Sequence, residues 1–162
     1  HNSQPWKFVV VRQKNAELAK VAYGGNYDQV MEAPVTIALF TDTDLQRRAR
    51  KIARVGGVKN FTDEKLQYYM QNLPAEYARY NEQQISDYLA LNAGLVAMNL
   101  VLALTDQGIG SSIILGFDKS KVNEVLEIEE RFRPELLITV GYASEKVEPS
   151  YRLPVDEIIE KR

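Results

Sequence analysis

The residues best suited to binding chemistry stand at the start of the chain, where the sequence reads HNSQPWKFVVV. Asn2, Ser3 and Gln4 place amide and hydroxyl groups side by side, and such groups hydrogen-bond to the polar edge of a heteroaromatic molecule. Pro5 restricts the backbone, and Trp6 offers a flat apolar surface. The β-branched run that follows is typical of a strand, so we expect a polar binding turn held by a strand.

The residue types that the chain lacks limit its own reactive chemistry. It contains no cysteine, which excludes thiol catalysis, cysteine-ligated zinc, iron–sulfur clusters and disulfides, and which fits a cytoplasmic location. His1 is the single histidine, so a multi-histidine metal site is excluded as well. If the chain is an enzyme, we expect a bound cofactor to supply the reactive atom, and we assign no catalytic side chain and no metal ligand.

Length and composition indicate one globular domain. A chain of 162 residues can bury a sizeable core, and we find no repeat or linker that would divide residues 1–162. A net charge of −2 argues against nucleic acid or an anionic membrane as a partner. No unbroken apolar run is long enough to span a bilayer, so we expect no membrane partner.

Hydrophobic periodicity predicts elements of both kinds. Residues 84–107 form a long helix that is apolar nearly all round, and such a helix must be enclosed by other elements or by a partner subunit. We therefore predict the α+β class, a sandwich in which a small mixed sheet packs around this helix. The expected strands are 7–12, 35–40, 111–115 and 136–140, and the other main helices are 43–54, 63–72, 118–126 and 155–161.

The N-S-Q-P-W-x-F string at residues 2–8 resembles the flavin-binding turn of the nitroreductase family, which comprises homodimeric FMN enzymes that use NAD(P)H. The resemblance implies a three-layer sandwich with a small, mainly antiparallel sheet, and a single nitroreductase-like domain over residues 1–162. It also implies that the chain lacks the family's N-terminal segment, which carries part of the flavin phosphate site.

The resemblance implies contacts to FMN at two places in the first third of the chain. His1, Asn2 and Ser3 occupy the turn that provides polar contacts to the flavin. Asn26 follows a glycine pair and stands where the family contacts the pyrimidine edge of the ring. Gln29 takes the place of a lysine that lies near N1 and O2 in many relatives, so it can donate a hydrogen bond but supplies no charge.

Two further places follow later in the chain. The family holds a backbone N–H against flavin N5 at the position of Gly116, and Ile113 would form an apolar floor beneath the ring. Leu115 stands where many relatives carry glutamate. Arg152 matches the C-terminal arginine that binds the flavin phosphate, whereas Ser150 replaces a second basic residue.

The activity implied by the resemblance is hydride transfer from NAD(P)H through flavin N5 to nitroaromatic, quinone or flavin acceptors. The expected partners are a second copy of the chain, with FMN at the interface, and a small aromatic electron acceptor. The first alternative is a flavin-binding or sensing protein of the same fold without efficient turnover, which Leu115 and Ser150 favour slightly. The second is nucleic-acid binding through the basic face of residues 47–54, although a solvated helix face explains that pattern better.

Overall fold

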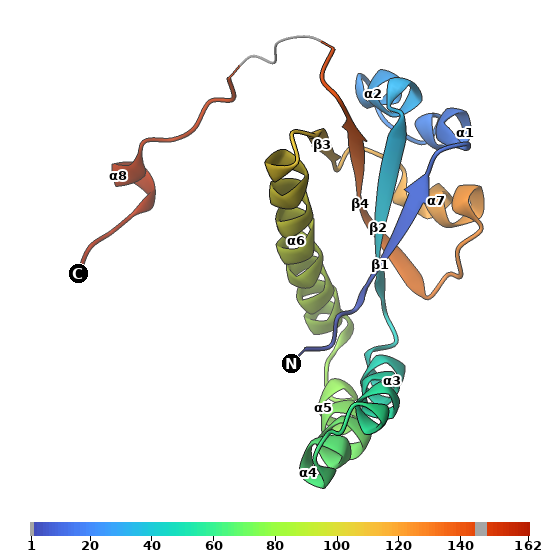
Figure 1. Ribbon diagram of the computed structural model, residues 1–162, viewed down its shortest axis with the longest axis vertical. Coiled ribbons are helices and arrows are strands. Elements are labelled where there is room, and N and C mark those ends of the chain that lie inside the picture. The colour runs from blue at the N-terminus through green and yellow to red at the C-terminus, as the bar shows by residue number, and fades with distance from the viewer. Residues whose placement is uncertain (1, 145–148) are drawn as a thin grey trace.

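The computed structural model describes residues 2–144 and 149–162. Its described part forms three layers, in which one long helix and a group of short helices cover opposite faces of a single sheet (Figure 1). The strands are β1 Trp6–Val11, β2 Val35–Asp42, β3 Gly110–Ile114 and β4 Phe132–Gly141. The helices are α1 Asn15–Ala19, α2 Asn26–Glu32, α3 Leu45–Val58, α4 Asp63–Gln67, the π-helical segment η1 Tyr68–Asn72, α5 Leu73–Tyr77, α6 Glu82–Asp106, α7 Lys119–Leu126 and α8 Val155–Ile158.

The sheet has the strand order β1-β2-β4-β3, and each of its three pairings is antiparallel. The predicted α+β class and mainly antiparallel sheet are therefore confirmed. Strand β2 lies inside the sheet and is apolar on both faces, as its V-T-I-A-L-F run predicted. Because β1 and β3 form the two edges of the sheet, the polar turn before β1 and Gly116 after β3 lie at opposite edges.

The two faces of the sheet have separate cores. On one face, α1, α2 and α7 bury Leu18, Val30 and Val122 against Phe40 and Leu137. On the other face, α6 lies close to the sheet because Ala93 and Ala97 are small, and they contact buried side chains of the central strands: Leu39, Leu136 and Ile138. Helix α6 is thus covered by the sheet on one side only, and its opposite side is exposed.

The sequence contains no uninterrupted apolar run that is long enough to span a bilayer. By length and mean hydropathy, however, α6 would suffice to cross one. The central helix of a globular domain meets the same criteria. Here Ala93 and Ala97 pack against the sheet, and the Asn92 side chain donates a hydrogen bond to the Tyr88 carbonyl at 2.8 Å. This packing gives α6 a place in a globular fold.

A small helical lobe of α3, α4, η1 and α5 extends beyond the end of the sheet (Figure 1). Local capping explains its boundaries, since Asp44 accepts a hydrogen bond from the Arg47 amide at 2.8 Å and begins α3. The lobe has its own core, which joins it to the first turns of α6 and consists of Leu45, Ala49, Ala53, Tyr69, Leu73, Tyr77 and Leu89.

The C-terminal residues 149–162 extend away from the rest of the chain, and α8 lies apart from the sheet and its helices (Figure 1). All of these residues are exposed, including the apolar Leu153, Val155, Ile158 and Ile159. The predicted helix over 155–161 is shorter in the structure, Val155–Ile158. We call residues 149–162 the C-terminal arm.

Candidate functional site

The polar turn before β1 is anchored to α6 through Ser3. This side chain is fully buried, and its hydroxyl lies 2.6 Å from the Tyr88 hydroxyl, which lies 3.1 Å from that of Tyr77. Burial and the hydrogen bond with Tyr88 raise the pKa of Tyr77, so this phenol stays protonated. The Ser3 side chain therefore positions the turn. The Asn2 side chain is exposed, and its Oδ1 accepts a hydrogen bond from the side-chain amide of Gln4 at 3.1 Å.

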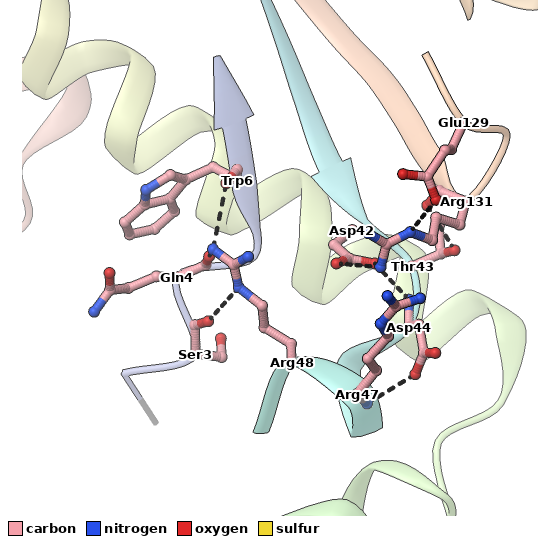
Figure 2. Close-up of polar contacts among 10 residues, drawn as sticks. All are labelled: Ser3, Gln4, Trp6, Asp42, Thr43, Asp44, Arg47, Arg48, Glu129 and Arg131. Carbon is pink, nitrogen blue, oxygen red and sulfur yellow. Dashed lines mark hydrogen bonds and ion pairs between the residues drawn. The ribbon is translucent and has the colours of Figure 1, made fainter. Parts of the chain in front are cut away.

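Arg48 of α3 holds the same turn from the other side (Figure 2). Its Nε donates to the Ser3 carbonyl at 3.2 Å, and its Nη2 donates to the carbonyls of Gln4 and, at 3.5 Å, Trp6. Burial lowers the pKa of the guanidinium, and the nearby Asp42 carboxylate partly opposes this shift. An arginine remains charged at neutral pH, so Arg48 places a positive charge directly behind the turn.

Arg48 was missed by the sequence reasoning, which considered only the basic face formed by Arg47, Arg50, Lys51 and Arg54. A signal was present, because Arg48 lies three residues after Leu45 and four before Ile52, on the flank of the apolar stripe. The partner of this flank is the polar turn, which lies more than forty residues earlier in the sequence. The contact is therefore visible only in the folded structure.

Asn26 and Gly116, which are 90 residues apart in the sequence, meet in the structure. The Asn26 side-chain amide donates to the Gly116 carbonyl at 3.0 Å, and the Tyr23 backbone N–H donates to the same oxygen at 2.9 Å. A Cβ at position 116 would lie 2.7 Å from Asn26 Nδ2, so a larger residue there would displace the Asn26 side chain from this position. The sequence assigned both residues to one site, and the structure brings them together.

Exposed apolar side chains lie next to this pair. Ile113 in β3 and Leu115 just after it are both exposed, and Gly116 is partly exposed. Gln29 lies on α2, one turn after Asn26, and is exposed too. We call Asn26, Gln29, Ile113, Leu115 and Gly116 the β3-edge group; it offers apolar surface, amide groups and an accessible stretch of backbone.

The remaining predicted residues lie elsewhere. Asn2 and Ser3 precede β1, at the sheet edge opposite the β3-edge group. Arg152 is exposed on the C-terminal arm, where its Nη1 donates to the Tyr151 carbonyl at 2.8 Å. His1 lies outside the described residues. A single chain therefore distributes the predicted site over three places and does not assemble it.

A hollow of about 460 Å³ adjoins the turn and is lined by Asn2, Ser3 and Gln4 together with α3, Phe61 and Tyr69. Its size is within the range of about 300–1,000 Å³ that is usual for ligand pockets. No group of acidic or histidine side chains in the described part of the chain could hold a metal ion. The chemistry available to these residues is thus hydrogen bonding, apolar contact and positive charge.

Comparison with known proteins gives a consistent result. A sequence model described as Nitroreductase family matches residues 1–142. Spy0809 of Streptococcus pyogenes serotype M6, provisionally named an NAD(P)H nitroreductase, is 63% identical over 162 residues, which are 100% of this chain and 80% of that protein. A crystal structure of a nitroreductase family protein from Streptococcus pneumoniae TIGR4 superposes with a TM-score of 0.97 at 85% identity, covering 100% of this chain and 81% of the other.

A third relative is a provisionally assigned nitroreductase from Exiguobacterium sibiricum 255-15, which was solved in complex with FMN. It is 27% identical, its TM-score is 0.89, and the match covers 99% of this chain and 78% of the other. The family match and the two streptococcal relatives extend over both the turn and the β3-edge group. The chain is therefore an oxidoreductase that belongs to the nitroreductase family.

Proposed function

We propose that the protein is an FMN-dependent oxidoreductase that passes hydride from NAD(P)H through flavin N5 to nitroaromatic, quinone or flavin acceptors. The observation that carries this proposal is the pairing of Asn26 with Gly116 beside exposed apolar residues. When bound, FMN would supply the atom that accepts and then donates hydride. The FMN complex of the Exiguobacterium relative supports this choice of cofactor.

The residues of the β3-edge group fit a flavin ring. Ile113 and Leu115 provide an apolar surface for a flat aromatic molecule, and Gly116 lets such a molecule approach the backbone. Asn26 fixes the orientation of the Gly116 peptide through its hydrogen bond to the carbonyl. Gln29 would donate a hydrogen bond to the polar edge of the ring. These residues bind and orient, and none of them needs to exchange a proton.

The complete site is proposed to form in a homodimer, with FMN at the interface. Within one chain the turn and the β3-edge group lie at opposite sheet edges, so a second copy would supply the missing half. Two exposed features support this assembly: the apolar outer side of α6, with Leu91, Leu95, Met98 and Leu102, and the C-terminal arm, which makes no packed layer with its own sheet (Figure 1). A cytoplasmic location stays a prediction.

Arg152→Ala is expected to weaken FMN binding by about 10- to 150-fold, because a charge-assisted hydrogen bond contributes about 1.5–3 kcal/mol. The measurement is the dissociation constant from flavin fluorescence. Arg162→Ala is the matched control, since Arg162 lies on the same arm and pairs with Glu160. Equal FMN affinity in the two variants would remove Arg152 from the proposed phosphate site.

The function itself is tested by the visible spectrum of the full-length protein with FMN, under anaerobic addition of NADPH or NADH. Flavin bands that bleach, and return when a quinone or nitroaromatic is added, are the expected result. Bands that persist in the presence of both donors would favour the alternative of a flavin-binding protein without turnover. A protein that does not retain FMN at all would contradict the flavin assignment.

A further inference from the structure

The hollow beside the turn has an unusual combination of walls. Its inner surface is apolar and aromatic, with Ile52, Val55, Phe61 and Tyr69. Four basic residues also line it, and the described lining residues include no acid: Arg48, Lys51, Lys59 and Lys65. Lys65 Nζ lies 4.3 Å from the centre of the Phe61 ring, which places a positive charge directly at the aromatic wall. We call this space the turn hollow.

A second hollow, of about 710 Å³, continues the positive surface along α3 and shares Arg48 and Lys51 with the turn hollow. It contains two acids, but both are engaged (Figure 2). Asp42 forms an ion pair with Arg131 at 3.0 Å, and Asp44 caps α3. The other basic residues that line it are Arg131 and, on α3, Arg47, Arg50 and Arg54.

The charge pattern of α3 differs from that of an ordinary solvated helix. Residues 45–58 contain five basic residues and no acid, although the whole chain has a net charge of −2. Like charges spaced three or four residues apart destabilise a helix, and solvated faces usually mix both signs. An anionic ligand at this surface would reduce the repulsion between the basic side chains. Binding such a ligand would therefore explain why α3 carries only positive charges.

We propose that the turn hollow binds an aromatic ring that carries a phosphate ester, with the ring inside the apolar and aromatic wall and the phosphate on Lys51 and Lys59. This proposal rests on the proposed function, because the turn hollow is lined by the same turn that would contact FMN. Two sources share this chemistry. One is the phosphorylated adenosine half of NADPH, and the other is a free flavin phosphate used as electron acceptor.

The test is calorimetric titration of the FMN-loaded protein with 2′,5′-ADP in one arm and with FMN beyond one equivalent in the other. In the arm that corresponds to the ligand, Lys51→Gln and Lys59→Gln are each expected to weaken binding about fivefold to tenfold, and added salt should weaken it further. Lys51→Arg should retain most of the affinity. Lys20→Gln is the matched control, since Lys20 is an exposed lysine directly after α1 and lines neither hollow.

Binding of 2′,5′-ADP that depends on these lysines would assign the hollow to the dinucleotide, and the KM for NADPH should then rise more than the KM for NADH in the same variants. Lysine-dependent binding of additional FMN would assign it to a flavin phosphate. Binding of neither probe, or binding that is equal in Lys51→Gln, Lys59→Gln and Lys20→Gln, would overturn the proposal. Because these titrations do not require turnover, their failure is distinct from failure of hydride transfer.

Discussion

Leu95→Glu is expected to convert a dimer of this protein into monomers and, with the interface lost, to abolish FMN retention. Leu95 is 65% exposed in the single chain and belongs to a stripe on the outer side of α6, with Leu91, Met98 and Leu102. The spacing of these four residues alternates between four and three, as in a helix–helix seam, and Ala90 and Gly94 beside the stripe permit close approach. The stripe therefore has the geometry of an interface between helices.

The expected magnitude follows from the symmetry. In a twofold dimer each substitution occurs twice, so about 3–6 kcal/mol of leucine burial is lost, and the dissociation constant rises by about 10²- to 10⁴-fold. Sedimentation velocity at micromolar concentration measures the oligomeric state, and flavin absorbance of the same sample measures retention. Val58→Glu is the matched control, because Val58 is 86% exposed at the end of α3. A dimer that survives Leu95→Glu would remove α6 from the interface.

The elements of the fold were predictable because their local patterns agree with their final environments. The alternation and apolar runs of β1, β2 and β4 indicated strands, and the capping residues Asp44 and Asp118 accept backbone hydrogen bonds at the starts of α3 and α7. The position of α6 relative to the sheet was less predictable from the sequence. Its apolar sequence required a cover on every side, but periodicity alone could not say that the sheet covers one side and leaves the other exposed.

Residues of the candidate site were predictable where the family resemblance assigned them, and not where only the packing of α3 and α6 decides their contacts. Asn26 and Gly116 were assigned to one site through the family resemblance, and the structure joins them by a hydrogen bond. The roles of Ser3 and Arg48 were not readable from the sequence. Ser3 was expected to contact the flavin, yet its side chain is buried against Tyr88, because the placement of α6 relative to the turn decides where this hydroxyl points.

Arg48→Met is expected to lower the melting temperature by about 3–12 °C and to weaken FMN binding. The methionine keeps much of the apolar stem but donates to none of the carbonyls of Ser3, Gln4 and Trp6. A hydrogen bond from a charged donor contributes about 1.5–3 kcal/mol, and each kcal/mol corresponds to about 2–4 °C in a domain of this size. The turn would lose its anchor on α3 and keep only its anchor through Ser3 and Tyr88.

One further variant separates the charge of Arg48 from its geometry, and a second serves as control. Arg48→Lys keeps the positive charge but cannot reach several carbonyls with a planar fork, so its melting temperature and FMN affinity should fall between those of wild type and Arg48→Met. Arg47→Met is the matched control, because Arg47 is the adjacent arginine and contacts Asp44 through its backbone amide. Thermal unfolding by circular dichroism and flavin fluorescence are the measurements. If Arg48→Met and Arg47→Met behave alike, the turn is held by the Ser3–Tyr88 contact alone, and Arg48 has no positioning role.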